Sequence, residues 1–316
     1  MSFSANIVPP FTLNLWLDIQ QMIQYNFMQR AIIIGTILSI IAGIVGTFVV
    51  LRHQAFAGES LSDVAFTGSI GGAALGINPL ITLLGTTIVA ALAMGGLGER
   101  LRGRDVAIGT VLAWILGLGD LFLVLFSQHI TTTGTGFSGV TILFGNLLGT
   151  SAEEIHIIGW VSVGVFAAMI VIARPLLFAS IDSEVAAARG VPVRMLGIAF
   201  ILLLAITVSM ATLAVGALLV FALVLLPAAI VQSLTLRPYI ALAFSAGLAV
   251  LITWVGIVIS FYTSFPASAC VSLLAFILYI MAIGSKAGRR QSARLMHSFD
   301  TQVPPDTHKM QSGETR

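Results

Sequence analysis

The chain has 316 residues, of which 58% are hydrophobic and only 9% are charged, and its formal net charge is +2. Soluble globular domains carry about 25% charged residues, so this composition excludes an ordinary soluble domain and predicts a polytopic membrane protein. The basic residues stand mostly at the ends of apolar segments. That distribution reports orientation in the membrane and excludes a basic groove for nucleic acid.

Residues 1–29 form an N-terminal segment that we expect to be extracytoplasmic. The segment lacks the short basic stretch followed by an apolar run that marks a cleaved signal peptide. The first span is therefore expected to serve as the insertion signal.

Residues 30–284 are predicted to form one all-α transmembrane domain of eight to nine helices, because apolar runs near the ~20 residues needed to cross a bilayer recur throughout. The spans fall at roughly 30–51, 59–77, 80–98, 106–127, 155–178, 195–212, 214–234, 239–262 and 266–284. With basic residues taken as cytoplasmic markers, a multi-pass protein of the cell membrane results, with its N-terminus outside and its C-terminus in the cytoplasm. The stretch 137–154 is too short and too rich in glycine to span, and is predicted to be a re-entrant or outer-surface helix.

The second predicted span carries two acids, Glu59 and Asp63. At about 100° per residue they lie about 40° apart on one helix face, with Ser62 and Thr67 close beside them. Acids inside a membrane cost several kcal/mol unless they are paired, hydrated or neutralised, and no Lys or Arg lies within two turns. A divalent cation held by carboxylate and hydroxyl oxygens is the natural partner. The alternative is that Glu59 caps the helix and that Asp63 is a buried, protonated acid.

Three glycines spaced four apart, Gly68, Gly72 and Gly76, fall on the far side of the same span. Small residues let a neighbouring membrane helix approach closely, so these positions are predicted to form its packing face.

Asp120 is a second intramembrane acid, in the fourth predicted span, within the run ILGLGDLFLVLF. It has no nearby basic residue and could therefore face the same cation pathway. It could equally be protonated, or could lie beside a water-filled outer vestibule.

The stretch between the fifth and sixth spans, Ser180 to Phe200, has an acidic start, an alanine-rich middle, a glycine stop and a proline that opens the next helix. We interpret it as a short helix lying flat on the cytoplasmic face, although a well-capped connector fits the same composition. The residues that define it are Asp182, Glu184, Arg189, Gly190 and Pro192.

Four motifs together carry a family resemblance: FVVLRHQAFAGESLSDVAFTG, LFGNLLGTSAEEI, SEVAAARGVPVRML and LAVGALLVFALVLLPAAI. In this order and spacing, over residues 28–284, they resemble the permease subunit of the ABC importers for zinc, manganese and iron. The resemblance implies that the segment Asp182 to Pro192 is the coupling helix that inserts into a cleft of the ATPase. It also implies a metal site in the second span.

The metal-site motif departs from the pattern of that family. The family usually reads GDALSH, so Glu59 stands where an aspartate is usual and Asp63 stands where a histidine is usual. An imidazole nitrogen suits zinc, whereas two carboxylates favour manganese, iron or another harder ion. The expected cargo is therefore a divalent metal ion whose identity the sequence leaves open.

The resemblance further implies a homodimer, a separate cytoplasmic ABC ATPase subunit and an extracytoplasmic metal-binding protein as partners, besides membrane lipids. The nucleotide-binding pattern GxxxxGK[ST] is absent from the sequence, so ATP is expected on the ATPase chain and this chain is expected not to be an enzyme. No covalently bound cofactor is expected, and no nucleic acid. The alternative function is a secondary transporter that is driven by an ion gradient and uses the same buried carboxylates.

Beyond the last span, residues 285–316 lose their apolar character and gain basic residues and two adjacent prolines. This composition predicts a disordered cytoplasmic tail.

Overall fold

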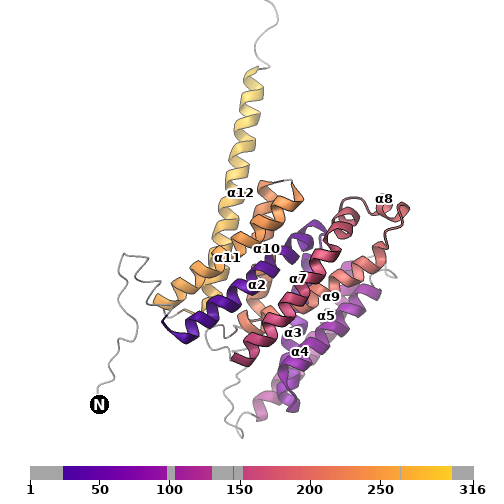
Figure 1. Ribbon diagram of the computed structural model, residues 1–316, viewed down its shortest axis with the longest axis vertical. Coiled ribbons are helices and arrows are strands. Elements are labelled where there is room, and N and C mark those ends of the chain that lie inside the picture. Colours follow the sequence, from indigo (N-terminus) through magenta and orange to yellow (C-terminus); the bar gives the residue numbers. More distant parts are fainter. Residues whose placement is uncertain are drawn as a thin grey trace, which may run out of the picture.

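The computed structural model describes residues 24–97, 104–129, 145, 152–235, 237–263 and 265–300. The regular structure of these residues is entirely helical (Figure 1). In chain order the helices are α2 (Asn26–Leu51), α3 (Ala55–Leu75), α4 (Pro79–Leu97), α5 (Arg104–His129), α7 (Ala152–Ile181), α8 (Ser183–Ala188), α9 (Val193–Val215), α10 (Ala217–Leu234), α11 (Pro238–Tyr262) and α12 (Ala267–Asp300). Most of the predicted helix at 137–154 and most of the N-terminal segment 1–29 lie outside the described residues, and residues 152–154 form the start of α7.

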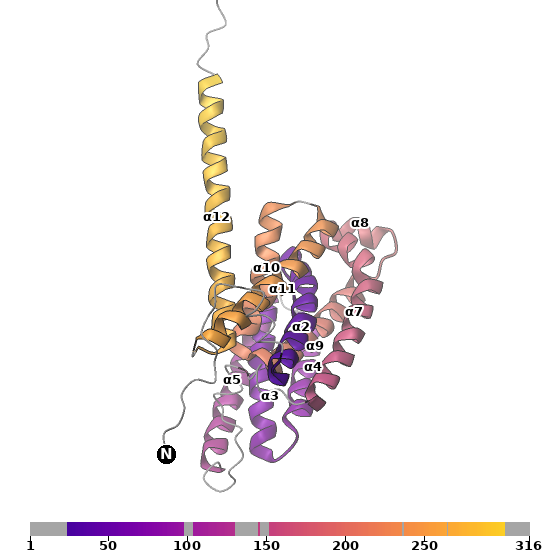
Figure 2. The ribbon, with the colours of Figure 1, turned by 60° about the vertical axis from the view of Figure 1, so that its left-hand side comes forward.

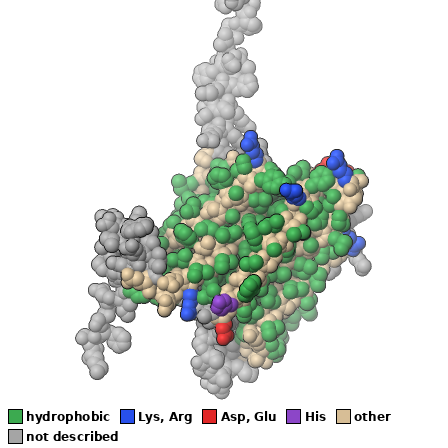
Figure 3. All heavy atoms as spheres, in the orientation of Figure 1, with side chains coloured by type: hydrophobic (Ala, Val, Ile, Leu, Met, Phe, Trp, Pro, Cys, Tyr) green, Lys and Arg blue, Asp and Glu red, His purple; other side chains and the backbone are tan. Residues whose placement is uncertain are grey.

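Each predicted span corresponds to one long helix, which confirms an all-α integral membrane protein. Seven of the described helices are long and apolar enough to cross a membrane. The apolar stretch of α10, Leu219–Leu234, is shorter, and α3 falls outside this set because its acids, serines and glycines lower its hydropathy. On the face shown in Figure 3 hydrophobic side chains dominate, and the charged side chains lie toward the ends of the helices.

The helices differ widely in how much of each lies inside the bundle. Within an apolar 18-residue stretch of α2 and of α9, 67% of the residues are buried, whereas only 11% are buried in the corresponding stretch of α5. Helix α2 packs against α7, α9, α10 and α11, while α5 packs against α3 and, less closely, against α4. Helix α5 is thus a peripheral helix of the single chain (Figure 2).

Small residues on α2 allow its backbone to approach two neighbours closely. A Cβ atom on Gly43 would lie 2.7 Å from the Ala246 Cα of α11, and one on Gly46 would collide with the carbonyl oxygen of Val224 in α10. The Ser245 hydroxyl donates a hydrogen bond to the Gly43 carbonyl at 2.9 Å. Close packing plus hydrogen bonds is how membrane helices associate when apolar burial gives no advantage over lipid.

Helices α9 and α10 are separated by a single residue, Gly216, whose φ of 93° and ψ of 150° favour glycine. The break leaves backbone groups inside the membrane domain that need partners. The Ser62 hydroxyl of α3 donates a hydrogen bond to the carbonyl of Ala217, the first residue of α10, at 2.5 Å and so ties α3 to the position of the break. Gly145 packs directly against Val215 and Gly216, and a side chain there would collide with their backbone.

Helix α12 continues to Asp300, beyond residue 284 where the last predicted span ends. Both ribbon views show it projecting from the bundle toward the side on which α8 lies (Figures 1 and 2). The first part of the segment predicted as a disordered tail is therefore helical.

Candidate functional site

Glu59 and Asp63 lie one turn apart on α3. The Glu59 side chain is exposed on the surface of the chain, and Asp63 is partly buried. Helix geometry therefore places both carboxylates on one face, as predicted.

The neighbours of α3 define where that face points. Ser62, about 60° to one side of Glu59 on the helix wheel, bonds to α10. Thr67, about 80° to the other side, packs against Gly119 of α5. The two acids thus occupy the sector of α3 between α10 and α5.

The opposite side of α3 packs against α4, as the glycine spacing predicted. Side chains on Gly68 and Gly72 would collide with Thr86 and Thr82 of α4. The prediction is wrong for Gly76, which ends α3 as its C-cap with a left-handed φ of 70°, and a Cβ atom at this position would meet no atom within 4 Å. Its role is conformational, because residues with side chains rarely adopt this φ.

Asp120 follows the residue of α5 that contacts α3. A Cβ atom on Gly119 would lie 2.6 Å from the Thr67 hydroxyl oxygen, and one on Gly71 would lie 3.0 Å from the Phe122 ring. These two contacts show that α3 and α5 run parallel.

The direction of Asp120 follows from this packing. Seen from the N-terminal end of a right-handed helix, each successive residue turns about 100° clockwise. One step beyond Gly119, this rotation turns the exposed Asp120 toward the sector that holds Glu59 and Asp63. Along the helix axes the order is Glu59, Asp63, then Asp120.

The hydroxyls predicted beside the acids have different surroundings. The Ser62 hydroxyl donates its hydrogen to the Ala217 carbonyl. The Thr67 hydroxyl is buried and has no hydrogen-bond partner within the described residues. No group of three or more His, Cys, Asp or Glu side chains in the described part of the chain is placed to hold a metal ion. The described part of a single chain therefore brings no three such ligands to one point.

The short helix predicted between the fifth and sixth spans is present as α8. The Asp182 carboxylate caps it by accepting from the backbone N–H groups of Glu184 at 3.1 Å and Val185 at 3.0 Å. Gly190 follows the helix with a φ of 81°, and Pro192 is the N-cap residue of α9. Within α8 only Ala186 is buried, so Glu184 and the capping Arg189 present exposed side chains.

Sequence reasoning missed two contacts that position α3. One is the bond from Ser62 to the start of α10, and the other is the contact of Thr67 with Gly119. The available signals were glycines: Gly216 interrupts an otherwise apolar run, and Gly119 directly precedes the isolated acid Asp120. A glycine alone does not identify the helix that packs on it.

Comparisons with known proteins agree with this architecture. The manganese transport system membrane protein MntC of Halalkalibacterium halodurans is 31% identical over 274 residues, covering 85% of this chain and 90% of that protein. The chelated iron transport system membrane protein YfeD of Yersinia pestis is 28% identical over 82% of this chain and 85% of its own length.

Among solved structures, PsaBC from Streptococcus pneumoniae in complex with Fab has the same fold. Its TM-score is 0.72 at 23% identity, with 84% of this chain and 93% of that chain covered. The model of the ABC 3 transport family matches residues 24–286. The chain therefore belongs to the ABC 3 transport family.

Proposed function

We propose that this protein is the membrane-spanning permease subunit of an ATP-binding-cassette importer that translocates a divalent metal ion. The observation that carries the proposal is the pair Glu59 and Asp63, which lies on an open sector of an intramembrane helix in a chain of this family. The names of relatives that carry manganese or chelated iron support the same class of cargo. Carboxylate oxygens favour manganese or iron over zinc.

A homodimer completes the site in this proposal. The described residues of a single chain bring no three suitable side chains together. A second copy that faces the same sector supplies a second Glu59 and a second Asp63. Four carboxylates converging from two copies of α3 stabilise a desolvated cation, and moving the two helices apart removes ligands and releases it. Asp120, farther along toward the outer side, is the first acid that the ion meets.

The proposed partners follow from the two ends of the bundle. On the cytoplasmic side, α8 presents exposed side chains that dock a separate ABC ATPase, which binds and hydrolyses ATP. On the outer side, a metal-binding protein delivers the ion. This orientation puts the N-terminus outside and the C-terminus in the cytoplasm, in agreement with the distribution of basic residues.

Reconstituted vesicles test the proposal directly. The permease, purified with its ATPase and placed in vesicles, should take up manganese or ferrous iron only when ATP is present on the ATPase side. An ATPase variant without hydrolysis should abolish uptake. Uptake driven by a proton or sodium gradient with the inactive ATPase would instead establish the secondary transporter.

Helix α8 gives a second expected result. Changing Glu184→Ala together with Arg189→Ala should lower co-purification of the ATPase by about tenfold, because both exposed side chains lie on the proposed docking surface. The membrane bundle should remain folded, since neither side chain is buried. Glu153→Ala, an exposed acid at the other end of α7, is the matched control and should retain the ATPase. Unchanged co-purification and uptake in the double variant would refute this docking surface.

A further inference from the structure

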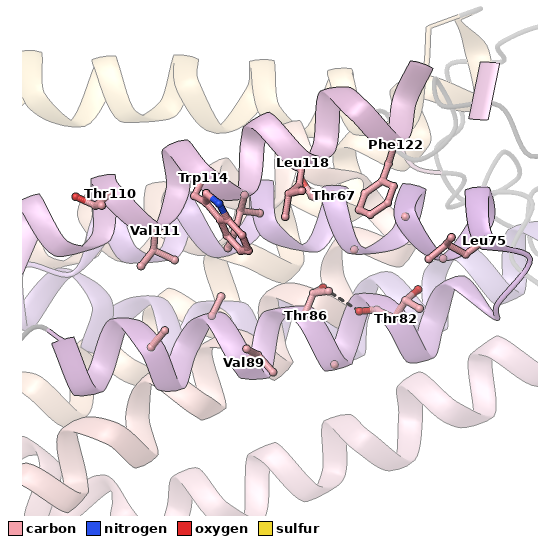
Figure 4. A pocket seen from close by; sticks show the side chains of 17 residues that line it. Thr67, Leu75, Thr82, Thr86, Val89, Thr110, Val111, Trp114, Leu118 and Phe122 are labelled. Atoms are coloured by element: carbon pink, nitrogen blue, oxygen red, sulfur yellow. Dashed lines mark hydrogen bonds between the residues drawn. The ribbon is translucent and has the colours of Figure 1, made fainter. Parts of the chain in front are cut away.

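A groove of about 560 Å³ lies between α4 and α5, with α3 as its floor (Figure 4). Gly68 and Gly72 of α3 leave the floor without side chains, and Val89 of α4 and Trp114 and Leu118 of α5 line the walls. The groove explains why α4 and α5, although consecutive in the chain, pack only loosely against each other.

The groove has almost no polar surface to offer a ligand. The Thr86 hydroxyl donates to the Thr82 carbonyl at 2.8 Å, and the Thr82 hydroxyl donates to the Pro79 carbonyl at 3.1 Å. Both threonine hydroxyls therefore donate their hydrogens within α4, and their Oγ atoms need no hydrogen-bond donor from a ligand. Thr67 and Thr110 also line the groove, and the Thr67 hydroxyl is itself buried and not exposed to an occupant. An occupant of this groove must therefore be mainly apolar.

The groove is continuous with the hydrocarbon-facing surface of the bundle. Two of its wall residues are largely exposed, Val89 at 67% and Trp114 at 71%. Leu75, at one end of the groove, is 62% exposed. All three helices that form it lie within the membrane domain, so acyl chains are the medium at this opening.

The groove and Asp120 lie on opposite sides of α5. Leu118, which lines the groove, is two residues before Asp120, and this separation corresponds to about 200° around the helix. A second copy that covers the acid-bearing sector therefore leaves the groove open to the bilayer. For this placement the inference rests on the proposed function.

We propose that this groove is a binding site for one acyl chain of a membrane lipid, which fills the space between α4 and α5. The chain packs on the glycine floor of α3 and on Trp114, and it supports the helix that carries Asp120. Without an occupant, α5 is held mainly by its contacts with α3, such as Thr67 with Gly119. The site thus couples the position of Asp120 to the surrounding lipid.

The test uses Trp114 as a probe of acyl-chain contact. The full-length protein is reconstituted in phosphatidylcholine vesicles with and without brominated acyl chains, which quench tryptophan on contact. The Trp114 signal is the difference between each protein and the same protein carrying Trp114→Phe. Gly85→Leu fills the groove, because a Cβ atom on Gly85 meets no atom within 4 Å. Gly117→Leu is the matched control, since it is equally unobstructed but does not line the groove.

We expect strong quenching of Trp114 in the unmodified protein and in Gly117→Leu, and at least a twofold reduction in Gly85→Leu. Val89→Phe, at an exposed wall position, should give the same reduction and serves if Gly85→Leu is poorly produced. Equal quenching in all variants would overturn the proposal. Absence of quenching in the unmodified protein would also overturn it, and would show that protein, such as a second copy, covers the groove. The measurement needs no transport, so its failure is distinct from a failure of the proposed metal import.

Discussion

Asp63→Asn and Glu59→Gln are each expected to reduce metal uptake by about a hundredfold at unchanged expression. Both changes keep the shape of the side chain and remove its charge. A cation inside the membrane domain depends on that charge, and losing one partner of a buried charge pair costs about 2–5 kcal/mol. The measurement is ATP-dependent uptake of radioactive manganese into vesicles that contain the permease and its ATPase.

Glu153→Gln is the control for this pair of variants, because Glu153 is an exposed acid in the first turn of α7, away from the α3 sector. It should transport normally. If both α3 variants import metal at the normal rate, the acids have a structural role and the proposed site is wrong. Asp63→His separates charge from ligand chemistry: it should retain transport and shift preference toward zinc, because imidazole nitrogen favours zinc over manganese.

Gly46→Ala is expected to destabilise the membrane domain by about 3 kcal/mol, at the upper end of the usual cost of overpacking. The new methyl group would collide with the carbonyl oxygen of Val224, which belongs to backbone and cannot rotate away. Helices α2 and α10 would have to separate, and the bond that the Gln232 side chain donates to the Thr47 carbonyl at 2.7 Å would be strained. A lowered midpoint in thermal unfolding, measured by size-exclusion chromatography in detergent, is the expected observation.

Gly247→Ala in α11 is the matched control for Gly46→Ala. A Cβ atom at Gly247 meets no atom within 4 Å, so this variant should unfold at or slightly above the temperature of the unmodified protein. A Gly46→Ala protein as stable as this control would show that the close approach of α2 to α10 is not required for folding.

Several features could be predicted from the sequence alone. The bilayer sets a minimum length for an apolar helix, so the apolar runs predicted one long helix for each span. The short helix α8 was predictable because Asp182 and Gly190 are local start and stop signals. The position of Glu59 and Asp63 on one face follows from helix periodicity, which requires no knowledge of neighbouring helices.

The tertiary structure alone decided what each helix face contacts. Gly68, Gly72 and Gly76 have the same spacing, yet only the first two pack against α4 while Gly76 ends the helix. Likewise, only the packing of Thr67 on Gly119 shows that Asp120 turns to the side of Glu59 and Asp63. The physical reason is that lipid and protein interior are both apolar, so hydrophobic periodicity does not distinguish a face that meets lipid from one that meets another helix. Those pairings depend on close contacts between residues far apart in the chain.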